Sequence, residues 1–230
     1  QSYLFISYIY MPDQKQMAKL TQYTYLMDGK KGKKKISSKA DKLGYDVISV
    51  NNGIVHYKNR EEGYNVVAVK GTNITNMKDL VSDAKIGLGI TSGDKQFKSR
   101  RNDIKNIYKN SDGDNYLTGH SLGSSIVLSS LAKSKSIRDN TKASYGYNTG
   151  YTQSFHDELS KGLSKTDKKE IKAVHTNFHT KNDIISTALT DKSLGDLKVI
   201  KADKGATLLE KHSLKNFTGE NDPVIDEAEL

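Results

Sequence analysis

The chain has 230 residues, of which 35% are hydrophobic and 27% charged, with 18 Gly, 2 Pro, no Cys and no Trp. This composition suits a globular domain with its own core, and it excludes a collagen-like or low-complexity chain, a disulfide-stapled scaffold and a cysteine-ligated metal site. No stretch approaches the ~20 apolar residues that a transmembrane helix needs. The formal net charge of +9 favours anionic partners such as phospholipid surfaces or nucleic acid.

The charge is distributed unevenly along the chain. Residues 218–230 hold five acidic residues and no Lys or Arg, so the remaining chain carries +14. Only four of the 36 basic residues are Arg, the residue that usually reads base edges, which argues against a specific nucleic-acid partner. We expect a single domain over residues 1–217, followed by an acidic C-terminal tail over residues 218–230.

The N-terminal segment, residues 1–11, is apolar and aromatic. It has no basic n-region and no small-residue cleavage site, so it is a poor signal peptide. Together with the absence of cysteine, this favours a soluble or peripheral protein, cytoplasmic or associated with a virion or other assembly, over a disulfide-bonded secreted one.

The first third of the chain predicts a helix, a hairpin and a buried strand. A helix is expected over 17–27. The lysine run over 30–35 is typical of a solvated loop, with a contact to headgroups or nucleic acid as the alternative. Asn51-Asn52-Gly53 between two β-rich runs indicates a hairpin over 45–57. The apolar run over 66–69 indicates a strand buried on both faces of a sheet.

Further along, segments with helical spacing alternate with short apolar runs. Helices are expected over 74–88, 97–108, 122–132, 155–163 and 208–217, and strands over 116–118, 143–147, 171–178 and 197–201. This alternation predicts an α/β fold with a mostly parallel central sheet covered by helices on both faces.

The strongest motif is Gly119-His120-Ser121-Leu122-Gly123, a G-x-S-x-G pattern. In a nucleophile elbow the serine occupies a strained turn between strand and helix, and the glycines let neighbouring backbone pass closely. Here an apolar strand precedes the motif and an apolar, small-residue helix follows it. The alternative is an ordinary Gly-rich turn. We expect Ser121 to be the nucleophile and His120 to pack under the elbow.

The order of roles in this fold is serine, then acid, then histidine. His212 lies beyond the last strand and is the candidate base, with a lone surface histidine as the alternative. Asp183 follows a C-terminal strand and is the candidate acid. Competing acids are Asp191, Asp196 and Asp203, of which Asp203 is the serious rival because it also follows a strand.

An oxyanion hole needs two N–H donors. One is expected from Leu122, the residue after the nucleophile. The other is expected from Thr72, which follows the buried strand and Gly71. A plain strand-to-helix turn capped by Thr72 is the alternative.

These residues resemble the class 3 lipase family, the fungal-type triacylglycerol lipases, over about residues 47–217. Gly119 to Gly123 matches the family's G-H-S-L-G in full. Further segments resemble other motifs of the family. Residues 70–72 resemble its R-G-T, and residues 79–83 resemble its D-W-x-x-D with Leu80 in place of the usual Trp. Residues 143–150 resemble its strand motif without the Gln-Pro-Arg, residues 177–185 its acid loop, and residues 212–217 its H-x-x-Y-F. The resemblance implies an α/β-hydrolase fold, a Ser121–Asp183–His212 triad, an oxyanion hole from Thr72 and Leu122, and hydrolysis of lipid esters.

The expected function is therefore carboxylic ester hydrolysis on a lipid or phospholipid, through an acyl-enzyme and without a metal or other cofactor. The basic body favours phospholipase A1-like action and peripheral contact with an anionic membrane, with a small soluble esterase as another possibility. Residues 85–93 suit a lid or an ordinary helix end equally well. From a different class, the alternative is a non-catalytic, lipase-like structural or membrane-docking component of a larger assembly.

Overall fold

A computed structural model describes residues 12–71, 95–183, 193–201 and 205–218. Seven strands in this part of the chain form one sheet, in which spatial order follows chain order. They are β1 (Tyr45–Asn51), β2 (Ile54–Asn59), β3 (Asn65–Val69), β4 (Asn115–His120), β5 (Thr141–Tyr147), β6 (His175–Thr180) and β7 (Asp196–Ile200). The pairs β1–β2 and β2–β3 are antiparallel, and every later pair is parallel.

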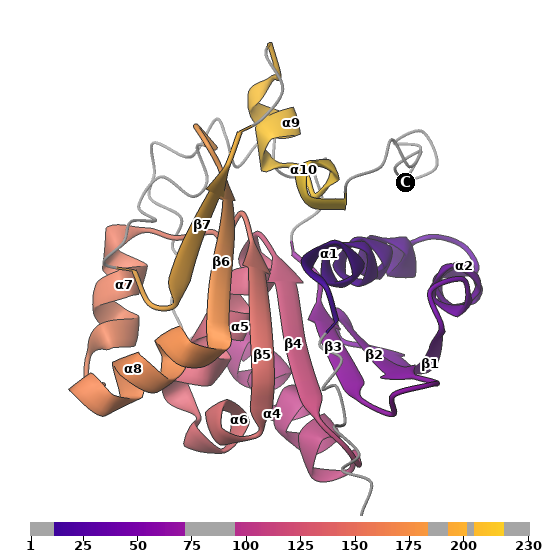
Figure 1. The fold of residues 1–230 in the computed structure, drawn as a ribbon, viewed down its shortest axis with the longest axis horizontal. Coiled ribbons are helices and arrows are strands. Elements are labelled where there is room, and N and C mark those ends of the chain that lie inside the picture. The colour runs from indigo at the N-terminus through magenta and orange to yellow at the C-terminus, as the bar shows by residue number, and fades with distance from the viewer. Residues whose placement is uncertain (1–11, 72–94, 184–192, 202–204, 219–230) are drawn as a thin grey trace, which may run out of the picture.

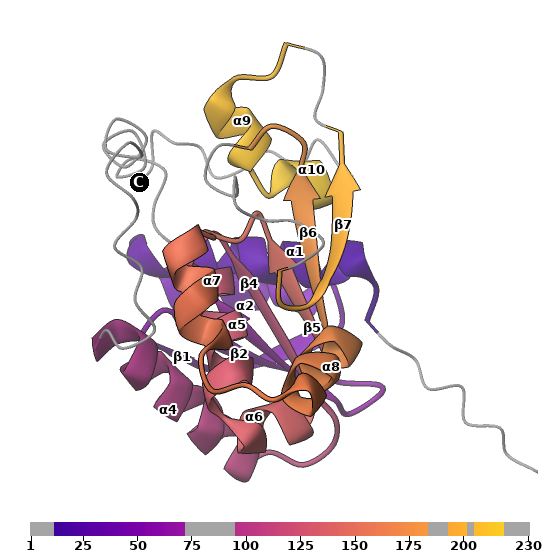
Figure 2. The same cartoon turned by 90° about the vertical axis from the view of Figure 1, so that its left-hand side faces the viewer.

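Helices cover both faces of this sheet (Figures 1 and 2). They are α1 (Gln14–Tyr23), the 3₁₀ helix η1 (Thr24–Asp28), α2 (Gly32–Asp41), α4 (Lys95–Lys109), α5 (Leu122–Lys133), α6 (Lys135–Asp139), α7 (Gln153–Ser160), α8 (Lys165–Val174), α9 (Leu208–His212) and α10 (Lys215–Thr218). The α/β fold and the mostly parallel sheet expected from the sequence are confirmed.

The two faces bury separate hydrophobic cores, and β3 shows how one strand serves both. Val66 and Ala68 lie in the core beneath α1, α2 and α10, whereas Val67 and Val69 lie in the core beneath α4 to α8. Because successive side chains of a strand point to opposite faces, a stretch that lies between two cores is apolar at successive positions, as residues 66–69 are.

The predicted hairpin is confirmed. Ile54 pairs with Asn51, and the two residues between them, Asn52 and Gly53, have φ of 48° and 72°. Positive φ at both central positions is the geometry that favours Asn-Gly in a two-residue turn.

Two expectations about elements were wrong. The lysine run over 30–35 is not all loop, because α2 begins at Gly32. The strand expected over 171–178 begins only at His175, and residues 165–174 form α8 instead. Ser164 and Asp167 make a capping box that starts this helix, and Ile171 is its buried residue. Helix α6 was not expected from the sequence, and the helix expected over 74–88 lies outside the described residues.

The carboxyl ends of the parallel strands meet at one edge of the sheet. In Figure 1 the strand arrows β4 to β7 point toward the same edge, and α9 and α10 lie beyond it. Residues that follow these strands are therefore brought together although they are far apart in the chain, as in other open α/β sheets.

Candidate active site

Ser121 occupies a strained turn between β4 and α5. Its φ is 55° and its ψ is −125°, a conformation that a non-glycine residue adopts only where its surroundings enforce it. The Ser121 N–H donates to the carbonyl of Tyr147 at 2.9 Å, and the Ser121 carbonyl accepts from the N–H groups of Ser124 and Gly150 at 3.0 and 3.3 Å. The backbone of the elbow is thus held on both sides.

The glycines of the motif are required by close backbone packing. A Cβ atom on Gly119 would lie 2.6 Å from the carbonyl carbon of Gly123, and one on Gly123 would lie 2.2 Å from the carbonyl oxygen of Val69. The first contact would force the end of β4 away from the start of α5, and the second would force the elbow away from the end of β3. The G-x-S-x-G spacing is therefore a requirement of packing at this turn.

His212 and Asp183 form a buried pair. His212 Nδ1 lies 2.8 Å from Asp183 Oδ2, although the two residues are 29 positions apart. Asp183 follows β6 in a turn closed by its N–H, which donates to the Thr180 carbonyl at 3.0 Å. Each residue is 2% exposed. The carboxylate accepts, so Nδ1 carries a proton, and in the tautomer with one ring proton Nε2 is bare.

Nε2 of His212 is buried and has no hydrogen-bond partner among the residues that the structure describes. A bare imidazole nitrogen whose other side is oriented by a carboxylate is equipped to accept a proton. Ser121 Oγ is not within hydrogen-bond distance of this nitrogen; catalytic contacts of this kind often tighten only in the complex with substrate.

His120 connects the elbow to the His212 segment. Its Nε2 lies 2.7 Å from the His212 carbonyl oxygen, and its Nδ1 lies 2.7 Å from the Tyr25 hydroxyl. Because a carbonyl only accepts, Nε2 carries the proton and Nδ1 accepts from Tyr25. Burial, followed by the nearby His212, lowers the pKa of His120 to about 3. His120 therefore stays neutral and links the elbow to the His212 backbone and to Tyr25, in keeping with the expectation that it packs under the elbow.

Tyr25 was not identified from the sequence. It lies in η1 and approaches the site through its hydroxyl, and burial raises the pKa of that hydroxyl so that it stays protonated. No motif marks Tyr25, because its contact with His120 spans 95 residues. Only the family-like motif around Ser121 pointed to this region of the sheet.

The oxyanion hole is described only in part. Leu122 is the first residue of α5, so its N–H has no acceptor within the helix and points out of the helix start. Gly71 lies against the nucleophile, since a Cβ atom on it would be 3.2 Å from Ser121 Cβ and 2.4 Å from the His120 carbonyl oxygen. Thr72, the other expected donor, lies outside the described residues, as do residues 79–83 and 85–93.

Of the competing acids, Asp196 is the one that the described residues include, and it does not lie beside His212. Asp196 opens β7 and pairs in register with Thr176, near the start of β6, so it lies toward the other end of the strands from Asp183. Asp191 and Asp203 lie outside the described residues. The structure thus brings Ser121, His120, Asp183 and His212 to one edge of the sheet.

The described residues contain no group of three or more His, Cys, Asp or Glu side chains suited to a metal ion. In the same part of the chain, no helix is both long and apolar enough to cross a bilayer.

The likeness of this chain to known proteins is found among solved structures. No protein-family model matches the sequence, and no curated protein matches it. Among solved structures, the chain is similar to the Lip2 lipase from Yarrowia lipolytica, with 12% sequence identity and a TM-score of 0.41. That match covers 83% of this chain and 80% of the lipase chain.

Proposed function

We propose that the protein is a serine ester hydrolase of the α/β-hydrolase type, with Ser121 as nucleophile, His212 as base and Asp183 as the residue that orients the base. The observation that carries the proposal is the buried His212–Asp183 pair, 2.8 Å apart, whose free Nε2 lies at the same sheet edge as a serine in a strained elbow. Burying a carboxylate–imidazole pair with one unpaired nitrogen lowers the stability of the folded protein, and such groups are concentrated at functional sites.

The proposed reaction is acyl transfer from an ester to Ser121 and then to water. His212 Nε2 takes the Ser121 hydroxyl proton as Oγ forms a bond to the ester carbonyl carbon, and the Asp183 carboxylate stabilises the resulting imidazolium. The N–H groups of Leu122 and Thr72 stabilise the oxyanion. His212 then protonates the departing alcohol, and a water molecule repeats these steps on the acyl-enzyme to release the acid.

We further propose lipid esters as the substrates, with action of the lipase or phospholipase A1 type at an anionic surface. The excess of positive charge outside residues 218–230 supports this preference. A basic protein concentrates at anionic bilayers, which raises the local concentration of their ester bonds relative to those of neutral oil.

A fluorophosphonate probe tests the nucleophile directly, since it phosphonylates only an activated serine. Wild type should be labelled and should hydrolyse a short-chain ester, whereas Ser121→Ala should do neither, because the attacking oxygen is gone. Ser129→Ala is the matched control: Ser129 lies in the same helix, is buried and makes no side-chain hydrogen bond among the described residues. It should be labelled at the wild-type rate.

Loss of labelling in Ser129→Ala but not in Ser121→Ala would contradict the assignment of the nucleophile. If wild type resists the probe both with and without anionic vesicles, the chain is better described as a lipase-like structural or membrane-docking component of an assembly.

A further inference from the structure

Helix α9, which carries His212, is held in place through its backbone carbonyl groups. The last carbonyls of a helix have no partner within it and need donors from elsewhere. The His212 carbonyl accepts from His120 Nε2 at 2.7 Å, and the Lys211 carbonyl accepts from Asn148 Nδ2 at 3.0 Å. Asn216 adds a local bond to the Lys211 carbonyl at 3.1 Å. The two distant donors come from the ends of β4 and β5.

Asn148 makes a second connection that reaches the acid. Its Oδ1 accepts from the Thr180 N–H at 2.8 Å, and the Thr180 carbonyl in turn accepts from the Asp183 N–H at 3.0 Å. The Asn148 N–H donates to the Phe178 carbonyl at 2.8 Å, which fixes the Asn148 backbone beside β6. One fully buried amide therefore joins the segment that leads to Asp183 with the helix that ends at His212.

The chemistry of the two partners explains why an amide is needed. The Thr180 N–H only donates and the Lys211 carbonyl only accepts, so the side chain between them must offer one acceptor and one donor. Asparagine does so on a short, stiff side chain. It also tolerates the left-handed backbone conformation found here, with φ of 42°.

We propose that Asn148 is a positioning residue that sets the geometry of the His212–Asp183 pair by holding α9 and the Thr180–Asp183 turn at a fixed separation. This proposal rests on the proposed function for its kinetic consequences, but the brace itself is a structural property of the pair. Misplacement of a catalytic group by about 1 Å costs on the order of 10²-fold in rate, so loss of the brace should be visible in turnover.

Two substitutions at residue 148 test the two hydrogen-bonded connections of Asn148 without straining its backbone. Asn148→Asp keeps the acceptor for the Thr180 N–H; in its ionised form it turns an oxygen without a proton toward the Lys211 carbonyl, so it removes the α9 connection and also buries a charge. Asn148→Gly removes both connections. Both residues accommodate positive φ, which alanine does not.

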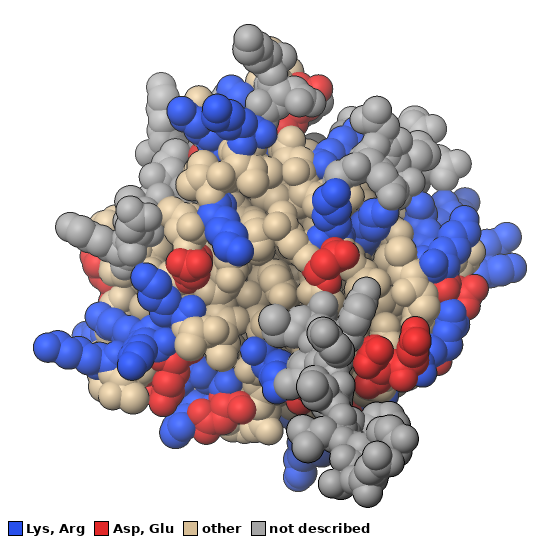
Figure 3. Space-filling model, viewed as in Figure 1, with Lys and Arg blue, Asp and Glu red and all other residues tan. Residues whose placement is uncertain are grey.

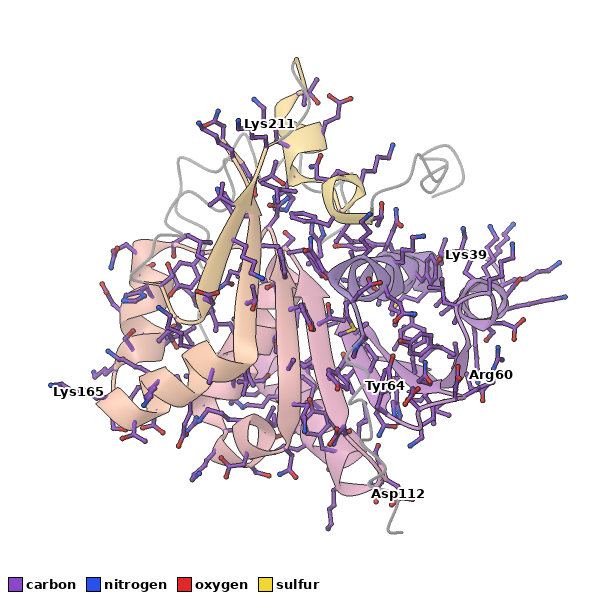
Figure 4. The ribbon with its side chains drawn as sticks, in the orientation of Figure 1. Lys39, Arg60, Tyr64, Asp112, Lys165 and Lys211 are labelled. Atoms are coloured by element: carbon purple, nitrogen blue, oxygen red, sulfur yellow. The ribbon has the colours of Figure 1, made fainter. Side chains whose placement is uncertain are left out.

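Asn65 provides the matched control. It is 1% exposed, its Nδ2 donates to the Asp112 carbonyl at 2.8 Å, and its Oδ1 accepts from His56 Nε2 at 3.0 Å. It lies at the start of β3, and Figure 4 places Asp112 at the end of the molecule opposite Lys211. Asn65→Asp thus removes an equivalent buried amide donor far from the site.

Three readouts are needed: kcat and KM on a soluble short-chain ester, the melting temperature, and the low-field proton NMR resonance of His212 Nδ1–H. Asn148→Asp should lower kcat about 10-fold and Asn148→Gly about 100-fold, with KM within about two-fold of wild type. Both should shift or broaden the resonance. Asn65→Asp should lower the melting temperature comparably while kcat and the resonance stay as in wild type.

Wild-type kcat and an unchanged resonance in both Asn148 variants would overturn the proposal. Equal losses of kcat in Asn148→Asp and Asn65→Asp would also overturn the proposal, because the loss of kcat would then be explained by lower stability alone. If wild type hydrolyses no ester, the proposed function fails, and the resonance still decides whether Asn148 holds the pair.

Discussion

Two interior histidines, His120 and His175, are kept neutral by burial, and each makes a fixed pair of hydrogen bonds. His175 Nδ1 lies 2.9 Å from Ser144 Oγ, and His175 Nε2 lies 3.1 Å from Asn177 Oδ1. Because that amide oxygen only accepts, Nε2 carries the proton, as it does in His120. Burial lowers the pKa of His175 to about 4.

A lowered histidine pKa makes the folded state sensitive to acid. Between about pH 4 and 6.5 the unfolded chain binds a proton at residue 175 that the folded chain does not, so the free energy of unfolding falls as pH falls. Each such group contributes a slope of about 1.4 kcal/mol per pH unit in that window. His175→Gln removes this titrating imidazole. The slope of its unfolding free energy against pH should therefore be smaller than that of wild type by about 1.4 kcal/mol per pH unit in this window.

Chemical denaturation at a series of pH values measures this slope. At pH 8 residue 175 is neutral in both states, so the difference there gives the packing cost of the substitution alone. Parallel curves for wild type and His175→Gln from pH 4 to 8 would contradict a depressed pKa.

The residues of the candidate site differ in whether nearby residues in the sequence are enough to predict them. The strained turn at Ser121 needs glycines two positions away on each side, so the sequence alone carries the pattern. Asp183 and His212 could be proposed from chain order, and the structure places them 2.8 Å apart. Tyr25 and Asn148 act through partners 95 and 63 positions away, which no local pattern encodes.

At the scale of elements, the short helix α9 depends on its capping box. Thr207 Oγ1 accepts from the Glu210 N–H at 3.3 Å, and Glu210 Oε2 accepts from the Thr207 N–H at 2.6 Å. Thr207→Ala removes the cap, which costs about 1 kcal/mol and loosens the helix that ends at His212. We expect kcat to fall several-fold, measured as ester hydrolysis at saturating substrate.

Ser164→Ala is the control, because Ser164 forms the same capping box with Asp167 at the start of α8. It should destabilise the protein to a similar extent in thermal melts while turnover stays at the wild-type level. A similar loss of turnover in both variants would refute a specific role for the α9 cap.

Elements were predictable where one local rule dominates. The Asn52-Gly53 turn and the apolar run over 66–69 in β3 follow from backbone conformation and two-sided burial. The strand expected over 171–178 was misplaced because a β-like alternation around His175 extends into Val174 and Ala173, whereas the Ser164–Asp167 box commits the preceding residues to a helix. Capping outweighed alternation there.

At the scale of the whole molecule, α2 and the turn before it form a one-sided basic segment. Residues 30–39 hold six Lys and no acid, whereas α8 interleaves four Lys with Asp167 and Glu170, both paired with Arg138. Figure 3 shows Lys and Arg side chains gathered on the right-hand side, where α2 lies.

We expect α2 to contribute most to binding at anionic bilayers. Replacing the exposed Lys30, Lys33 and Lys34 by Gln should weaken binding to phosphatidylserine-containing vesicles about 100-fold at low salt, from about 1 kcal/mol per lysine. The same replacement at Lys165, Lys168 and Lys169 is the control and should weaken it only several-fold. Vesicle co-sedimentation measures both, and equal losses would show that net charge alone governs binding.

The covering of the two sheet faces has a consequence for synthesis. The connections between the parallel strands, α4 to α8, all lie over one core, and the other core is covered by α1 and α2 from the beginning of the described chain and α10 from its end. His212 belongs to that last segment. A chain emerging from the ribosome completes the elbow and the Asp183 turn first, and it gains the proposed base only when α9 and α10 dock. From the folding of the elbow until α9 docks, the nascent protein would therefore hold the proposed nucleophile without the base that activates it.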